Sequence, residues 1–137
     1  MSKRVKKRQN TIAKNSDNEG YRPQYLKFNF TYIVHDENLE DRYIVDLFNR
    51  MRFLSSVPFT QMLNYNKRIG FEFELIDIKK QIPQKFVDRF GKKTDEKYAI
   101  FRIYSNNQPV VARVIGIIIE KVMYIFFIDI GGNLYKH

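Results

Sequence analysis

Two arginines and a tyrosine in the last forty residues could hold a phosphate group and act on it. Arg102, Arg113 and Tyr124 each lie in a segment rich in β-branched and aromatic residues, which favours strands. A guanidinium group binds phosphate through paired hydrogen bonds and keeps its charge at any working pH. A tyrosine hydroxyl nearby could exchange protons with the reacting oxygens. These three residues are therefore candidate catalytic residues.

The turns between the segments determine whether these side chains meet. If Glu120-Lys121 forms a two-residue hairpin loop, Ile117 opposes Tyr124 and Arg113 opposes Ile128. If residues 106–109 form a four-residue loop, Arg102 opposes Arg113. Opposed residues share a face of a sheet, so Arg102, Arg113 and Tyr124 are predicted to project from one side.

A salt-bridged arrangement is the alternative to a phosphate site. Two directly opposed cations destabilise a sheet unless a carboxylate or another anion neutralises them. A slip of one residue would also move a strand's side chains to the other face. The carboxylates that could pair with the arginines are those of Glu72, Glu74, Glu120 and Asp129.

Other chemistry has weaker support. Only His35 and His137 are available for acid–base work, and the first reads as an exposed loop residue. Glu72, Glu74 and Asp77 could ligate a divalent metal, although a solvated strand face explains them more simply. The chain has no cysteine, and it has no phosphate-binding loop, dinucleotide fingerprint or zinc spacing. We therefore expect no metal and no cofactor.

The charge distribution favours a polyanionic partner. The net charge is +9, and residues 1–22 carry seven basic against two acidic residues, a net of +5. Such a basic arm attracts nucleic acid, although it could equally serve as a solubilising tail. The interleaved aromatic and basic residues of Tyr65-Asn66-Lys67-Arg68 could stack on single-stranded bases, although a loop whose cations reach into solvent is the ordinary alternative. The candidate nucleic-acid-binding residues are Lys3, Arg4, Lys6, Lys7, Arg8, Lys67, Arg68 and Lys136.

The hydrophobic patterns predict an α+β domain over residues 25–137, after a disordered basic tail over residues 1–24. We expect a strand over Leu26–Val34 with one buried face, on which Leu26, Phe28, Phe30, Tyr32 and Val34 lie. A helix follows, with Asn38 as N-cap and a stripe of Leu39, Tyr43, Leu47, Met51 and Leu54, widened by Ile44 and Phe48.

The second half of the domain is expected to be mainly β. A short helix capped by Ser56 should precede a strand over Phe71–Ile76, and Pro83 should open another short helix that ends at Gly91. The segments Tyr98–Tyr104, Val110–Ile119 and Val122–Ile128 should form an antiparallel meander. Val110–Ile130 has the length of a membrane span, but Arg113, Glu120 and Lys121 within it favour two strands.

This order of elements, with arginines on two meander strands, resembles the RelE/ParE toxin superfamily. The ending over residues 101–137 also resembles that of many small bacterial and phage proteins. The resemblance implies a metal-independent ribonuclease that cleaves ribosome-bound mRNA and is inhibited by an antitoxin, which we expect to be acidic. The absence of cysteine fits a cytoplasmic location. The resemblance also adds Tyr135, Lys136 and His137 to the candidates for the site. ParE-like members bind gyrase instead, and residues 64–97 are long for a minimal toxin.

We therefore expect a small basic protein that acts on RNA as a toxin-type endoribonuclease, with no membrane association. The alternative is a non-catalytic phage or prophage module that binds protein or nucleic acid. The two hypotheses differ in what they require of Arg102, Arg113 and Tyr124. A ribonuclease needs the three side chains clustered and unpaired, whereas a binding module can have them salt-bridged.

Overall fold

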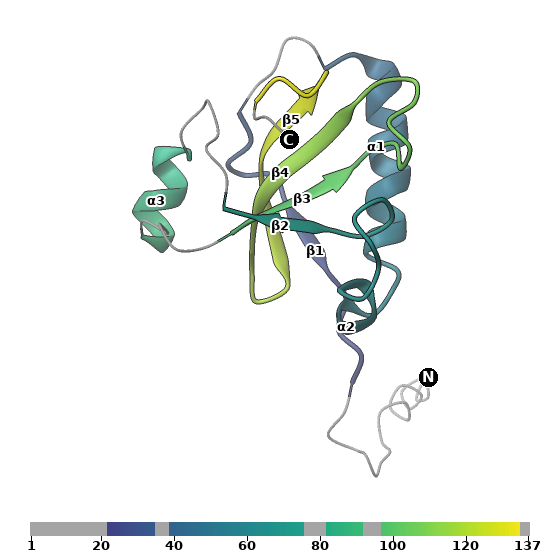
Figure 1. Cartoon of the computed structure of the whole chain (residues 1–137). Coiled ribbons are helices and arrows are strands. Elements are labelled where there is room, and N and C mark those ends of the chain that lie inside the picture. The colour runs from purple at the N-terminus through teal and green to yellow at the C-terminus, as the bar shows by residue number, and fades with distance from the viewer. Residues whose placement is uncertain (1–21, 35–38, 76–81, 92–96, 135–137) are drawn as a thin grey trace, which may run out of the picture.

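The chain forms a five-stranded mixed sheet with helices on both faces (Figure 1). The computed structural model describes residues 22–34, 39–75, 82–91 and 97–134. The strand order is β1-β5-β4-β3-β2; β1 runs parallel to β5, and the other pairs are antiparallel. The strands are β1 (Lys27–Asn29), β2 (Glu72–Glu74), β3 (Tyr98–Arg102), β4 (Ala112–Ile119) and β5 (Val122–Ile130). The predicted α+β class, with an N-terminal strand, helices and then antiparallel strands, is confirmed.

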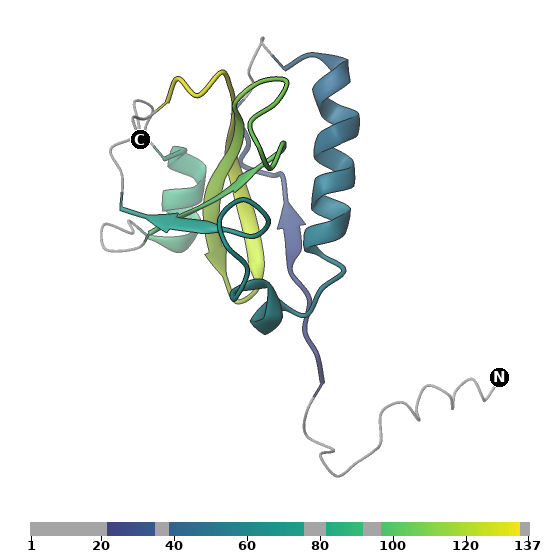
Figure 2. The same cartoon turned by 45° about the vertical axis from the view of Figure 1, so that its right-hand side comes forward.

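The helices divide between the two faces of the sheet. One face is covered by α1 (Asp41–Leu54) and the short α2 (Phe59–Met62), whose Leu54 and Met62 are fully buried in the core on that side. The other face is covered by α3 (Gln84–Phe90), through the fully buried Phe86. Figure 2 shows α1 and α3 on opposite sides of the sheet. Gly91 ends α3 with a φ of 84°, as predicted.

The C-terminal meander forms with the predicted hairpin loop. Glu120 and Lys121 have φ values of 52° and 65°, the left-handed conformation that a tight two-residue turn requires. Ile119 consequently pairs with Val122, and Ile117 pairs with Tyr124. The apolar region is therefore two strands, over residues 112–119 and 122–130. Among the described residues, no helix has the length and apolar composition that a membrane span requires.

A β-bulge changes the register further along this hairpin. Gly116 pairs with Ile125, but the preceding residue, Ile115, pairs with Phe127, so β5 contains one extra residue there. The prediction that Arg113 opposes Ile128 is therefore wrong, and Arg113 opposes Asp129. The bulge thus brings a carboxylate, in place of an apolar side chain, to the position across from the arginine.

Glycine at position 116 allows this close approach of the two strands. A Cβ atom there would lie 2.1 Å from the carbonyl oxygen of Tyr124, closer than two such atoms can come. Any larger residue would push β5 away from β4 at the bulge.

Helix α1 buries a narrower stripe than its sequence predicts. Tyr43, Leu47 and Leu54 are buried against the sheet, but Ile44 and Phe48 stay 45% and 59% exposed. Each residue of a helix turns about 100° from the one before it. Ile44 and Phe48 therefore lie one step around the helix from the line of contact, beyond the reach of the sheet.

The N-terminal strand is shorter than predicted. The side chain of Asn29 accepts a hydrogen bond from the Thr31 amide at 2.8 Å, and a turn follows. The side chains that were expected to share one face therefore lie on two: Leu26 and Phe28 pack on the α1 side of the sheet, whereas Tyr32, after the turn, packs on the α3 side.

The start of α2 and the length of β2 differ from the predictions. Pro58, not Ser56, precedes α2, and the Ser56 hydroxyl donates back to the Phe53 carbonyl. The predicted strand over Phe71–Ile76 is limited to β2, and its expected apolar Phe73 is 39% exposed. Asn38 lies outside the described residues.

Candidate anion-binding site

Three charged residues form a row across the middle strands, on the face that α3 partly covers. Arg102 of β3 pairs with Arg113 of β4, which pairs in turn with Asp129 of β5. Their chain neighbours Phe101, Val114 and Ile128 belong to the core on the α1 side. Because side chains alternate along a strand, the charged row faces the opposite side. The predicted opposition of Arg102 and Arg113 is confirmed.

Both arginines have buried donors without an acceptor in the described part of the chain. Arg113 is only 5% exposed, and its Nε and Nη1 atoms have no hydrogen-bond partner there. Arg102 is half-buried; its Nη1 donates to the Ser105 carbonyl at 2.8 Å, but its Nε has no partner. A buried donor without an acceptor costs about 1–3 kcal/mol. The arginine pair can therefore offer several hydrogen bonds to an anion.

Asp129 does not form an ion pair with its neighbour. Its carboxylate accepts hydrogen bonds from the backbone amides of Asn133 and Leu134, at 2.9 and 3.0 Å. Within the described ranges, the only ion pair closer than 4.0 Å joins Arg42 to Glu40, at 3.1 Å. Asp129 thus lies beside Arg113 and lowers the local positive potential, but its oxygens hold the turn after β5.

That turn passes close to the Arg113 guanidinium. Gly132 has a φ of 70°, and a Cβ atom added there would lie 3.5 Å from Nη1 of Arg113 and 2.9 Å from the Val111 side chain. The backbone of residues 131–134 therefore covers part of Arg113, which contributes to its burial.

Tyr124 lies on the same face as the arginines but is not close to them. Four ladder steps separate its pair, Ile117–Tyr124, from the pair Arg113–Asp129, which corresponds to roughly 13 Å along the strand. Tyr124 is buried under α3, where its ring lies 4.9 Å from that of Phe90 and 5.8 Å from that of Phe86. The structure places it in an aromatic cluster rather than beside the arginine pair.

Arg50 of α1 connects the arginine pair to the second predicted basic segment. Its Nε donates to the Arg102 carbonyl at 2.8 Å, and its Nη2 donates to the carbonyls of Arg68 and Ile69. Burial lowers the pKa of Arg50, yet an arginine stays charged at any working pH. The exposed Lys67 and Arg68 are therefore held near the end of β3. Nothing in the helical pattern of the sequence indicates this role of Arg50.

The remaining candidates lie outside the described residues. These are the tail residues Lys3, Arg4, Lys6, Lys7 and Arg8, the two histidines, Tyr135 and Lys136. Two lysines that were not among the predicted nucleic-acid-binding residues lie together, Lys121 in the hairpin turn and Lys27 at the start of β1. Lys27 and Lys121 line a 390 Å³ hollow together with Tyr25 and Glu120, next to the point where the described chain begins.

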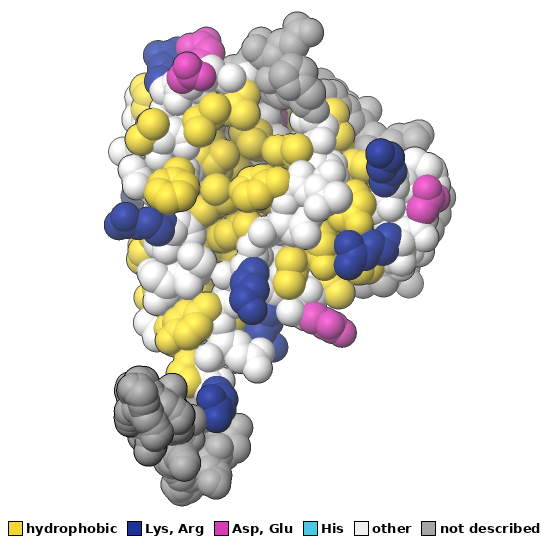
Figure 3. Space-filling view, turned by 180° about the vertical axis from the view of Figure 1, so that it is seen from behind, with side chains coloured by type: hydrophobic (Ala, Val, Ile, Leu, Met, Phe, Trp, Pro, Cys, Tyr) yellow, Lys and Arg dark blue, Asp and Glu magenta, His cyan; other side chains and the backbone are white. Residues whose placement is uncertain are grey.

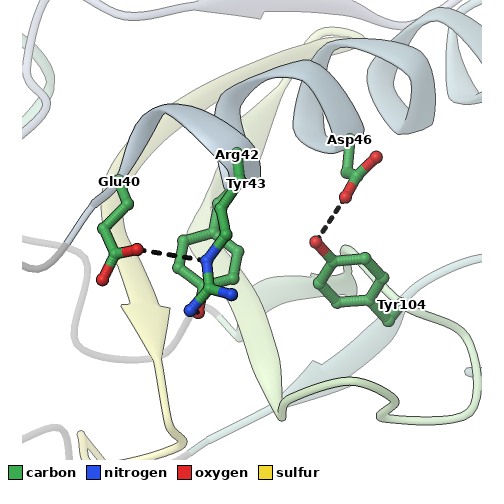
Figure 4. Close-up of polar contacts among 5 residues, drawn as sticks. All are labelled: Glu40, Arg42, Tyr43, Asp46 and Tyr104. Carbon is green, nitrogen blue, oxygen red and sulfur yellow. Dashed lines mark hydrogen bonds and ion pairs between the residues drawn. The ribbon is translucent and has the colours of Figure 1, made fainter.

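A second polar contact joins α1 to the loop after β3 (Figure 4). The Tyr104 hydroxyl donates to the Asp46 carboxylate at 2.5 Å, beside a hollow of 290 Å³. Burial, followed by this hydrogen bond, raises the pKa of Tyr104 to about 12. Both groups are satisfied by each other, so the contact ties two elements together and leaves no polar group for a ligand.

No metal centre is assembled by the described residues, which contain no group of three or more metal-ligating side chains. Glu72 and Glu74 lie in β2, and Asp77 lies outside the described ranges. Comparisons with protein-family models, curated proteins and solved structures find no match to this chain. The arginine pair is therefore the strongest candidate site, and its chemistry is the binding of an anion.

Proposed function

We propose that this protein binds RNA and that the Arg102–Arg113 pair holds a backbone phosphate. The observation that carries the proposal is the pair of adjacent guanidinium groups with buried donors that no described residue satisfies. A phosphate oxygen can accept several such donors at once, and charge-assisted bonds of this kind are about twice as strong as neutral ones.

The two arginines would have different roles in holding the phosphate. The half-buried Arg102 would contact the phosphate from the more open side, whereas Arg113 would contact it from deeper in the sheet and would also strengthen the positive potential behind it. Burial reduces solvent screening, so a charge at the position of Arg113 acts more strongly than one at the surface. Arg50 adds a third positive charge next to the Arg102 carbonyl, at the end of β3.

RNA rather than a small anion is favoured by the distribution of further cations. Lys67 and Arg68 lie beyond Arg50, and the basic segment over residues 1–22 carries a net charge of +5. Cations spaced over a long surface suit a polyanion, since each neutralised phosphate releases counterions.

A metal-independent endoribonuclease of the RelE type is a second candidate function. It is favoured by the adjacency of two guanidinium groups, which can stabilise the charge that develops on a phosphorane. Tyr124 lies too far from the pair to exchange its proton there, so Tyr135, Lys136 or His137 would have to do so. Ribosome-bound mRNA would then be the substrate, and an acidic antitoxin would be a partner.

Fluorescence anisotropy with a labelled single-stranded RNA tests the binding proposal. We expect Arg113→Met and Arg102→Gln each to weaken binding by about ten-fold or more, because a hydrogen bond to a charged group contributes about 1.5–3 kcal/mol. If each arginine contacts a phosphate, the slope of log affinity against log salt should fall in magnitude by about 0.7. Deletion of residues 1–22 should reduce the slope further.

Arg42→Gln is the matched control, since it removes one exposed arginine from α1 that is paired with Glu40 rather than placed beside the arginine pair. It should change RNA affinity by less than the site variants do. If Arg113→Met and Arg102→Gln bind RNA as the unmodified chain does, the proposed site is wrong. For the second candidate, the unmodified chain should cleave mRNA in a translating extract, and cleavage of free RNA should persist in EDTA. Cleavage that EDTA abolishes would contradict a metal-independent mechanism.

A further inference from the structure

Helix α1 presents an unusual surface on the side that faces away from the sheet. Ile44, Val45 and Phe48 are 45%, 62% and 59% exposed, although all three are large apolar residues. Seen from behind, hydrophobic side chains gather over the half of the molecule that carries α1 (Figure 3). Figure 2 shows α1 as the outermost element on its face of the sheet, so the surface is accessible to another molecule.

Two charged residues of opposite sign flank the apolar surface. Asp41 lies at the first position of α1, and Arg52 lies in its last turn; both are exposed. At 3.6 residues per turn, these two residues and the three apolar ones fall within an arc of roughly 100°. The exposed stripe of α1 (Asp41, Ile44, Val45, Phe48 and Arg52) is therefore acidic at one end, apolar in the middle and basic at the other end.

The stripe is complementary to itself when reversed. The midpoint between Asp41 and Arg52 coincides with the midpoint between Val45 and Phe48. If a second copy of α1 packs antiparallel about a two-fold axis at this midpoint, Asp41 meets Arg52 of the other copy. Val45 then meets Phe48 of the other copy. An interface around a two-fold axis requires this kind of self-complementarity.

We propose that the protein forms an antiparallel homodimer through the exposed stripe of α1. The apolar area is small compared with the roughly 800 Å² per partner of a standard interface, so the dimer should be weak and depend on concentration. The arginine pair lies on the opposite face of the sheet, and the dimer leaves both copies of it open. The inference does not depend on the proposed function, because it rests on different residues.

Sedimentation analysis of the full chain over a broad concentration series tests the proposal. The unmodified protein should shift from monomer to dimer as its concentration rises. Val45→Glu should stay monomeric, because it places like charges at the centre of the interface. Asp41→Arg and Arg52→Asp should each stay monomeric alone, since each homodimer would bring two pairs of like charges together. A 1:1 mixture of these two variants should dimerise, because every charged pair then has opposite signs.

Rescue by mixing is specific to this arrangement. Residues 41 and 52 are about 16 Å apart along one helix and cannot compensate each other within a chain. Far-UV circular dichroism confirms that each variant is folded, and the double variant Asp41→Arg/Arg52→Asp should again self-associate. The proposal is overturned if the unmodified chain stays monomeric throughout, which would leave the stripe for a different partner. It is also overturned if the single variants dimerise as the unmodified chain does, since the interface would then lie elsewhere.

Discussion

Arg113→Met should raise the stability of the protein while it removes the proposed phosphate contact. Methionine matches much of the length of arginine, so the substitution leaves little cavity. It also removes two buried donors, Nε and Nη1, that have no acceptor among the described residues. If Arg113 instead stabilised the fold, its replacement would lower the free energy of unfolding.

The size of the effect follows from the surroundings of Arg113. Relief of the buried donors contributes about 1–3 kcal/mol each. The lost attraction to Asp129 is partly balanced by the lost repulsion from Arg102, since both residues are direct neighbours across the sheet. We therefore expect the free energy of unfolding to rise by roughly 0–3 kcal/mol, in keeping with replacements of buried charges by apolar residues.

Urea unfolding followed by circular dichroism measures this change, and RNA binding is measured on the same samples. Arg102→Gln provides the comparison, because its side chain is more exposed and retains a polar group. Breaking a buried ion pair costs about 3–5 kcal/mol. A loss of that size in Arg113→Met would refute the reasoning, because it would mean that the guanidinium is paired in the folded protein.

Two further predictions concern the fold. Gly116→Ala should lower the free energy of unfolding by about 3 kcal/mol, at the upper end of overpacking effects, because its Cβ atom would meet the Tyr124 carbonyl oxygen at 2.1 Å. Gly91→Ala meets no atom within 4 Å, but its φ of 84° and ψ of 166° lie in a region that essentially only glycine occupies, so it should cost about 1–2 kcal/mol. A smaller loss in urea unfolding for Gly116→Ala than for Gly91→Ala would contradict the clash. The pKa of Tyr104, raised to about 12 from an ordinary 10, means that the folded state favours the neutral phenol. Its contribution to stability is complete below pH 10 and is lost as the pH rises toward 12. Between pH 10 and pH 12 the free energy of unfolding should therefore fall more steeply for the unmodified chain than for Tyr104→Phe. Tyr25→Phe, at an exposed tyrosine, is the control. Identical pH profiles for the unmodified chain and Tyr104→Phe would contradict the role of the Asp46 contact.

The local pattern of the sequence identified the order and type of the main elements of the fold. Alternating β-branched and aromatic residues identified the meander, and Gly91 marked the end of α3. The two-residue loop at Glu120-Lys121 established the register close to the hairpin, because pairing begins at the loop and is counted outward from it. The opposition of Arg102 and Arg113 followed from the same count across the preceding loop. These features depend on residues near one another in the chain, so their signals are present in short windows.

Tertiary contacts decided the rest, because each involves residues that approach from distant parts of the chain. The bulge at Gly116 depends on the carbonyl of Tyr124, and it places Asp129 rather than Ile128 beside Arg113. The carbonyls that Arg50 binds belong to residues 18, 19 and 52 positions away in the sequence. The exposure of Phe48 was also decided at this level, since a helical pattern shows which residues share a stripe but not how much of it the sheet covers. The sequence by itself thus determined which side chains could share a face, whereas the packing of the whole chain determined which of them are buried, paired or left exposed.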